Sequence, residues 1–225
     1  MGSALRILVI VGTLFAGCAS EAPSEILEQT RRYPTVVQLP APDLNGPLSL
    51  EQALDERRSV REYATTALTL DEVGQLLWAG QGITDDDGHR TAPSAGARYP
   101  LELYAITATE IMHYLPVGHR VEQRTDTRTL HALSDAAFGQ QFVGNAPLVV
   151  VVAADPDRTE QEYGAMAGDL VNREAGHAAQ NILLQATALG LVAVPVGGFD
   201  PAAVARLLAL PPGQAVLYLI PVGEP

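Results

Sequence analysis

The sequence predicts an α+β domain, in which helices and strands are interspersed irregularly along the chain. Apolar runs of strand length occur between segments that carry helix-start signals, without internal repeats or low-complexity runs. Of the 225 residues, 47% are hydrophobic and 18% are charged, which suits one folded domain with a substantial core. We therefore expect an α+β or mixed α/β sandwich.

Helix-start signals occur at three places. Ser49 is followed three residues later by Gln52, and Thr69 by Glu72, so each pair matches a capping box. Asp200 stands directly before a proline, a combination typical of a helix N-terminus. The expected helices span residues 49–57, 69–78, 130–138 and 165–189, and a further helix begins at residue 200.

Short apolar runs predict the strands. Residues 148–154 are continuously apolar, as in a strand that is buried on both faces. Gly190 is expected to end the long helix before the next strand begins. The expected strands span residues 103–109, 113–115, 148–154, 191–196 and 215–222.

The N-terminal segment has the features of a bacterial lipoprotein signal. Residues 7–14 form an apolar run too short to cross a membrane as a mature helix, and small residues precede Cys18. Cys18 is the only cysteine, so it cannot form an internal disulfide. We expect a signal peptide over residues 1–17, lipidation of Cys18, and export to the cell envelope with a lipid anchor in the membrane. Phe15 stands where a lipobox usually has Leu, and the alternatives are an ordinary signal peptide or an N-terminal helix.

The segment after Cys18 is expected to be a tether. Residues 18–47 contain five prolines and no sustained periodicity, which is typical of an extended linker. The folded domain is therefore expected over residues 48–225.

The charge balance excludes several functions. The formal net charge of −12 disfavours a nucleic-acid partner, because phosphates repel an acidic protein. All 14 basic residues are Arg, so a mechanism that uses a lysine amine is excluded. No metal site is expected, because there is no cysteine pair, and His113 and His119 have no further ligand in register.

The segment 57–61 is a candidate anion site. Arg57, Arg58 and Arg61 surround Ser59, and guanidinium groups with a hydroxyl suit a phosphate. The alternative is a solvated helix end, where Arg complements the helix dipole.

Two loops have small residues that a ligand could approach closely. Residues 90–100 are rich in small side chains and bracketed by prolines, although a tight loop would have the same composition. At residues 194–200 a strand ends at Gly197 and Gly198 before a helix begins, so free N–H groups could point at a ligand, or the turn could be an ordinary connection.

A polar stripe lies on the expected helix 165–189. Glu174, His177, Asn181 and Gln185 fall on one face at helical spacing. We interpret the stripe as buried and hydrogen-bonded, at a subunit interface, rather than catalytic.

Taken in order, these segments resemble the FMN-dependent nitroreductase superfamily, and within it the SagB/ThcOx-type branch. The similarity runs over residues 48–224 and is carried by residues 57–61, 93–104, 174–177 and 195–200. Each segment alone is weak evidence for the superfamily, whereas the ordered set of segments is specific to it.

The resemblance implies a nitroreductase-like fold with a central, mostly antiparallel β-sheet flanked by helices, in an intertwined homodimer with FMN at each subunit interface. The implied cofactor-binding residues are Arg57, Arg58, Ser59 and Arg61 for the phosphate and pyrimidine edge; Pro93, Ser94, Ala95 and Gly96 from the partner subunit; and Pro195, Val196, Gly197 and Gly198 against the flavin ring. It identifies no catalytic side chain, because the cofactor carries the chemistry.

The implied function is two-electron or hydride transfer on an unidentified small-molecule or peptide substrate. The alternative is a non-catalytic envelope lipoprotein with a degenerate nitroreductase fold that acts as a binding partner. Azoline oxidases of the branch use a Lys-Tyr pair, so a chain without Lys departs from them, and Ala97 replaces an Asn that many nitroreductases carry. An exported enzyme would not meet NAD(P)H, so we expect another donor, or transfer of electrons to oxygen or a quinone.

Overall fold

A seven-stranded sheet organises residues 33–225, which are the residues that the computed structural model describes. The strand order is β1-β4-β3-β2-β5-β7-β6, and every pair of neighbouring strands is antiparallel. The strands are β1 (Thr35–Gln38), β2 (Leu101–Ile106), β3 (Glu110–Leu115), β4 (Arg120–Thr125), β5 (Leu148–Ala154), β6 (Val192–Ala193) and β7 (Ala215–Gly223).

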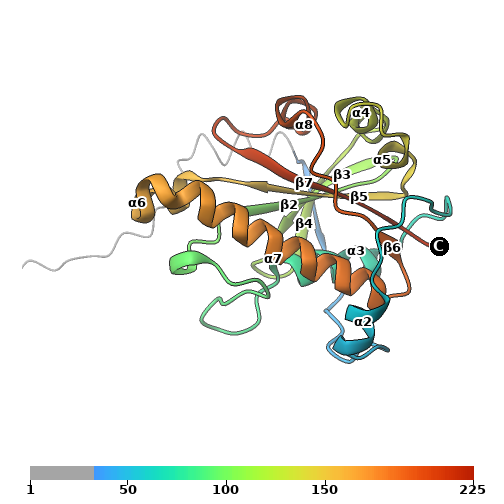
Figure 1. The fold of residues 1–225 in the computed structure, drawn as a ribbon, viewed down its shortest axis with the longest axis horizontal. Coiled ribbons are helices and arrows are strands. Elements are labelled where there is room, and N and C mark those ends of the chain that lie inside the picture. The colour runs from blue at the N-terminus through green and yellow to red at the C-terminus, as the bar shows by residue number, and fades with distance from the viewer. Residues whose placement is uncertain (1–32) are drawn as a thin grey trace, which may run out of the picture. The chain divides into compact units, whose positions relative to one another are not determined.

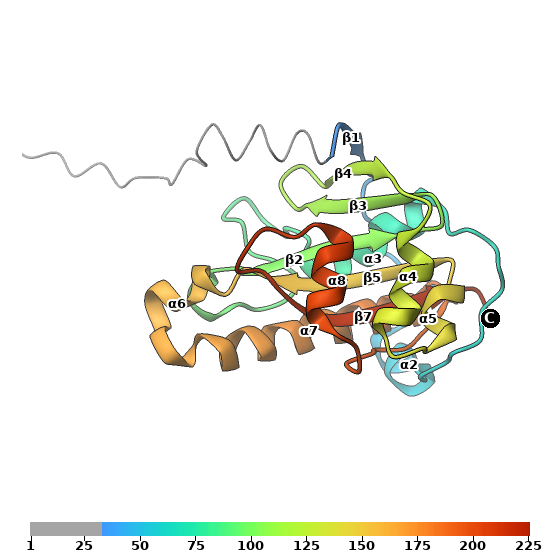
Figure 2. The same cartoon turned by 90° about the horizontal axis from the view of Figure 1, so that it is seen from above.

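Helices cover both faces of this sheet (Figure 1). One face packs against α3 (Leu70–Gln81) and α7 (Ala167–Ala188), and α2 (Leu50–Glu56) lies against α7. The other face carries α4 (Thr129–Ala136), α5 (Gln141–Asn145) and α8 (Pro201–Leu208), which lie across the strands in Figure 2. The α6 helix (Asp157–Tyr163) and the turn η2 (Gly164–Met166) lead into α7. The predicted α+β architecture, a mostly antiparallel sheet flanked by helices, is confirmed.

Burial of the central strand β5 on both faces explains its continuous apolar sequence. All seven of its residues are buried, with Val150 and Val152 in the core beneath α3 and α7. Val149 and Val151 face the opposite core beneath α4, α5 and α8. Each buried Val contributes roughly 1.5–3 kcal/mol, so a polar residue here would disrupt a core on either face.

The helix starts follow the signals in the sequence. Both capping boxes form, because the side chains of Ser49 and Thr69 accept the backbone N–H groups of Gln52 and Glu72. Asp200 accepts the N–H groups of two residues in the first turn of α8. Gly190, with φ +74°, follows α7 in the left-handed conformation that glycine tolerates.

The folded unit begins earlier than the predicted boundary at residue 48. Residues 35–38 form the edge strand β1, which pairs with β4, and the flanking Tyr33 and Leu39 are buried. The second half of the predicted tether is therefore part of the domain. A strand of four residues among prolines has too short a pattern to stand out in the sequence. The signal peptide and Cys18 lie outside the described residues.

The predicted strand 191–196 is interrupted rather than continuous. Its register against β7 is the same from Val192 paired with Gly223 to Val196 paired with Leu219. Proline has no N–H donor, and Pro195 stands in this stretch opposite a segment that contains Pro221. The β6 strand therefore ends at Ala193, although the Val194 N–H still donates to the Pro221 oxygen at 3.3 Å and Val196 forms a bridge with Leu219.

A buried charge cluster joins β2, β3 and β4. His113 contacts Glu122 through Nδ1 and Glu102 through Nε2, each at 2.8 Å, and Arg158 also pairs with Glu102. Burial alone would lower the pKa of His113, but hydrogen bonds to Glu102 and Glu122 raise it to about 9. The imidazolium form is thus the native form at neutral pH.

The cluster predicts a loss of stability in alkaline solution. A raised pKa means that the stabilisation is complete below about pH 6.5 and is lost as the pH rises through about 9. His113→Gln leaves two buried carboxylates without their shared cation, which should cost about 3–5 kcal/mol at pH 7. Urea unfolding at pH 7 and pH 10 measures both effects, and equal losses in wild type and variant between these pH values would contradict the assignment.

Candidate functional site

Two segments that are distant in the sequence meet at one end of the sheet. Ser59 forms a parallel bridge with Ala193, and the Val60 N–H donates to the Ala193 oxygen at 3.1 Å. The segment 57–61 therefore runs alongside β6, immediately before the segment 195–198. The structure brings together two of the three predicted groups of cofactor-binding residues.

The segment 57–61 carries three positive charges without acidic partners. Arg57 caps the C-terminus of α2, and Arg58 Nη1 donates to the Arg57 oxygen at 2.8 Å. The Arg61 guanidinium lies 5.5 Å from the centre of the Phe142 ring. Among residues 33–225 none of the three forms an ion pair with a carboxylate. In a protein of net charge −12, such a cluster suits an anion.

An open glycine turn adjoins this cluster. Val196 donates its N–H to Leu219 at 2.8 Å, and the following Gly197 and Gly198 are exposed. A Cβ atom at Gly197 would meet no atom within 4 Å, so the backbone faces open space. A planar ligand could therefore lie against this turn, which also offers backbone N–H donors.

Gln140 and Phe142 also support the site, and neither is among the residues predicted from the sequence. Gln140 Nε2 donates to the oxygens of Ala137 and Gly198, each at 2.8 Å, and so holds the turn against the end of α4. Phe142 is the ring beneath Arg61. Neither residue lies in a recognisable motif, so no signal in the sequence would have found them.

The predicted loop 93–96 lies at the opposite end of the sheet. It directly precedes β2, whose first residue Leu101 pairs with Ala154 at the end of β5. The cationic cluster is next to Ala193, which pairs through Val222 to Leu148 at the start of β5. Seven strand residues span about 20 Å. Figure 1 shows α6 at one end of the sheet and α2 with β6 at the other.

The loop is held in place by α6. Gly96 has φ +56°, and a Cβ atom there would lie 2.8 Å from the Tyr163 hydroxyl and 2.9 Å from Glu162 Oε2. Arg98 pairs with the same Glu162 carboxylate at 2.5 Å. Glycine is therefore required at residue 96 by both conformation and space.

The polar stripe on α7 is only partly buried. Glu174 is 3% exposed, Asn181 Nδ2 donates to the Thr91 oxygen at 3.1 Å, and Gln185 accepts from Gln75 at 3.2 Å. His177 is exposed in the single chain, so its predicted burial at a subunit interface stays a prediction. Its offset from the other three around the helix places it on the outer face.

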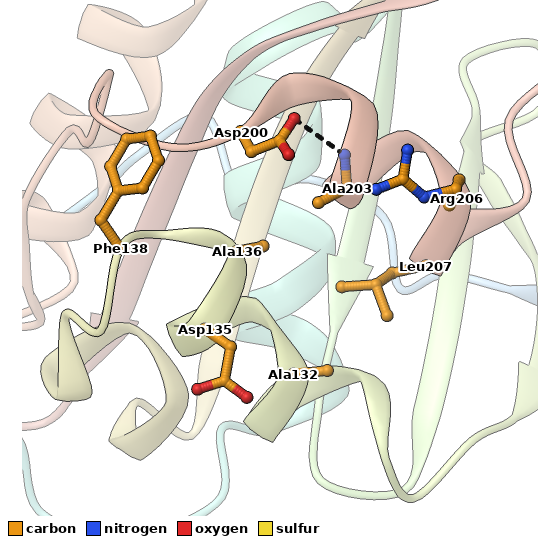
Figure 3. Close-up of a pocket in the computed structure, with 8 residues that line it drawn as sticks. All are labelled: Ala132, Asp135, Ala136, Phe138, Asp200, Ala203, Arg206 and Leu207. Atoms are coloured by element: carbon orange, nitrogen blue, oxygen red, sulfur yellow. Dashed lines mark hydrogen bonds between the residues drawn. The ribbon is translucent and has the colours of Figure 1, made fainter.

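A hollow of about 520 Å³ lies between α4 and α8, beyond the glycine turn (Figure 3). Phe138 is at its border, 71% exposed, with φ +57°. Asp200 also lines the hollow, and its carboxylate is used to cap α8. The remaining lining residues are Ala132, Asp135, Ala136, Ala203, Arg206 and Leu207.

Two features are absent from residues 33–225. Within residues 33–225 no group of three or more His, Cys, Asp or Glu side chains is arranged so that it could hold a metal ion. No helix in the same range is long and apolar enough to span a membrane.

Comparison with known proteins gives consistent matches. The family described as "Nitroreductase family" matches residues 54–224. A Methanocaldococcus jannaschii protein assigned as a nitroreductase is 39% identical over 84% of this chain and 96% of its own. The crystal structure of a protein assigned as a nitroreductase from Ralstonia eutropha JMP134 has a TM-score of 0.75 and 29% identity, covering 84% of this chain and 89% of that one. The NADPH:FMN oxidoreductase of Vibrio harveyi, complexed with NAD+, shares the fold at a TM-score of 0.60 and 22% identity, covering 78% of this chain and 66% of that one. The chain thus has the nitroreductase fold and belongs to the Nitroreductase family.

Proposed function

We propose that the protein is an FMN-dependent oxidoreductase that transfers two electrons to or from a small-molecule or peptide substrate. The observation that carries this proposal is the position of three Arg side chains, none in an ion pair within residues 33–225, beside an open glycine turn. Family membership supports an enzyme over the alternative of a non-catalytic binding partner.

The residues at this end of the sheet fit FMN. Arg57, Arg58 and Arg61, with the Ser59 hydroxyl, are donors suited to a phosphate. The exposed backbone at residues 197–198 suits close approach of a flat ring. The Vibrio harveyi protein that shares the fold is named an NADPH:FMN oxidoreductase, which supports FMN as the ligand. When bound, the flavin would supply the hydride chemistry.

The chain itself would bind the cofactor, orient it and stabilise the charge that develops during electron transfer. The guanidinium groups would hold the phosphate, and Gln140 would keep the glycine turn in place through the Gly198 oxygen. Backbone N–H groups of the turn would face charge that develops during electron transfer and stabilise it without reorganisation.

The complete site requires a second copy of the chain. The loop that contains Pro93, Ser94, Ala95 and Gly96 lies about 20 Å from the cationic cluster within one chain, because the length of β5 separates them. In a homodimer this loop would come from the partner subunit, as the resemblance to the family implies.

We further propose that the protein is exported and lipid-anchored through Cys18, and that it lies near the SagB/ThcOx-type branch. In that location its electron donor or acceptor would not be NAD(P)H, because nicotinamide cofactors are cytoplasmic. The lack of Lys separates it from azoline oxidases that use a Lys-Tyr pair.

Removal of the cationic cluster should abolish cofactor retention. Arg57→Ala with Arg61→Ala removes two phosphate donors that have no structural ion pair, so we expect FMN affinity to fall by at least about 100-fold with little loss of stability. Flavin fluorescence titration measures the affinity, and thermal unfolding checks the fold. Arg206→Ala, at an exposed Arg on α8, is the matched control. Unchanged FMN affinity in the double variant would show that the phosphate site is elsewhere.

A shared site predicts complementation between two defective chains. The double Arg variant lacks one half of the site, and Ala95→Glu would place a bulky acidic group on the other half. Each homodimer should bind no FMN, whereas the mixed dimer should regain one intact site, that is, one FMN per dimer. Absorbance of tag-selected mixed dimers measures this ratio. Failure of the mixed dimer to bind FMN, while wild type does, would place the whole site within one chain.

The lipid anchor predicts a defined effect of Cys18. Cys18→Ala should eliminate incorporation of a labelled fatty acid and release the protein from the membrane fraction of the producing bacterium. Equal membrane association of wild type and variant would argue against lipidation at this residue.

A further inference from the structure

A buried carboxyl group lies beneath the loop 93–96. Glu174 on α7 is 3% exposed, and its Oε1 has no hydrogen-bond partner among residues 33–225. Burial of a carboxyl oxygen without a partner is unfavourable by several kcal/mol if the group is ionised. Packing alone therefore does not explain a glutamate at this position.

The groups around Glu174 come from α3 and from the loop that follows it. Gln81 accepts from Arg90 Nη1 at 2.7 Å, while its Nε2 is buried and has no partner within the described chain. Ser94 accepts the Tyr99 N–H at 2.9 Å, which leaves its hydroxyl hydrogen available to donate. Ser94 and Gln81 both lower the pKa of the Glu174 carboxyl, although neither forms a hydrogen bond with Oε1 within 3.5 Å.

The α7 helix thus supports the loop at two points. Asn181, two turns beyond Glu174 on the same face, donates to the Thr91 oxygen at 3.1 Å and holds the start of the loop. Glu174 lies beside Ser94 in the segment predicted to contact the cofactor. Of these two supports, only the carboxyl can change its charge.

Burial raises the pKa of Glu174 to about 7, while the Ser94 hydroxyl, the Arg90 guanidinium and the Gln81 amide oppose this rise. Burial also lowers the pKa of Arg90, whose guanidinium lies 4.6 Å from the centre of the Tyr99 ring. Glu174 therefore changes between neutral and negative within the physiological pH range.

The other charged groups nearby are occupied or exposed. On α6, Glu162 pairs with Arg98. On α7 itself, Asp169, Arg173 and His177 are exposed. Arg90 is thus the charged side chain that lowers the pKa of the Glu174 carboxyl.

We propose that Glu174 is a positioning residue that holds Ser94 and the loop 93–96 toward the cofactor of the partner subunit, and that its charge alters how readily this cofactor is reduced. The inference rests on the proposed function, because it needs a flavin on the far side of the loop. A negative carboxylate would disfavour added electrons, whereas the neutral acid would not.

The first test uses the protein without cofactor. A raised pKa means that stability is complete below about pH 4.5 and falls as the pH rises toward 7. Relative to Glu174→Gln, the folding equilibrium constant of wild type should fall by up to about tenfold per pH unit in this window. Asp169→Asn, at an exposed carboxylate of the same helix, should follow wild type. Parallel profiles for wild type and Glu174→Gln would overturn the inference.

The second test measures the midpoint potential of bound FMN from pH 5.5 to pH 8.5. Glu174→Gln should match wild type at pH 5.5, where both side chains are neutral, and should have the higher potential at pH 8.5. Ser94→Ala should move the bend in the wild-type profile to higher pH, because the hydroxyl that lowers the pKa of Glu174 is lost. Asp169→Asn should leave the profile unchanged.

The outcomes separate the two proposals. If wild type binds FMN but Glu174→Gln has the wild-type potential at every pH, the inference fails and the proposed function stands. If wild type binds no FMN at all, the proposed function fails, and the role of Glu174 toward the cofactor fails with it.

Discussion

The pairing of β5 with β2 on one side and β7 on the other determines where each candidate binding residue lies. Leu101 and Ala154 place the loop 93–96 at one end of the sheet, and Leu148 with Val222 places β6 at the other. β5 is buried on both faces, so its register cannot shift without moving valines out of two cores. The separation of the two halves of the site is therefore fixed by the best-packed strand of the domain.

The α7 helix connects these two ends. Its first half carries Glu174 beneath the loop, and its second half packs near α2 and β6 beside the cationic cluster. A helix of 22 residues spans about 33 Å, enough to contact both halves of the proposed site. In a dimer, α7 of each subunit would support the loop of one site and lie near the cationic cluster of the other site. A titratable group on α7 would then act on the partner's cofactor rather than on that of its own chain.

The sequence was sufficient where the local signal coincided with the tertiary environment. The apolar run of β5 and the capping residues Ser49, Thr69 and Asp200 each predicted the observed element. The edge strand β1 was missed because its four residues, two valines between Thr35 and Gln38, are too few to show a periodicity. A stripe at helical spacing does not say which of its edges faces the core of its own chain, so the exposure of His177 in the single chain could not be read from the sequence. That residues 57–61 and 195–198 lie close together was predicted only through the family resemblance, since no local pattern records a contact between distant segments. The role of Gln140 was found only in the structure.

The central claim is that a dimer of this chain holds FMN between the cationic cluster of one subunit and the small-residue loop of the other. The most direct test is the visible absorbance spectrum of the purified protein after incubation with FMN and removal of free cofactor, recorded together with its mass in solution. We predict a dimer with flavin bands at about one FMN per chain. A folded, dimeric and colourless protein would contradict the account and would mean that the Arg cluster binds some other anion.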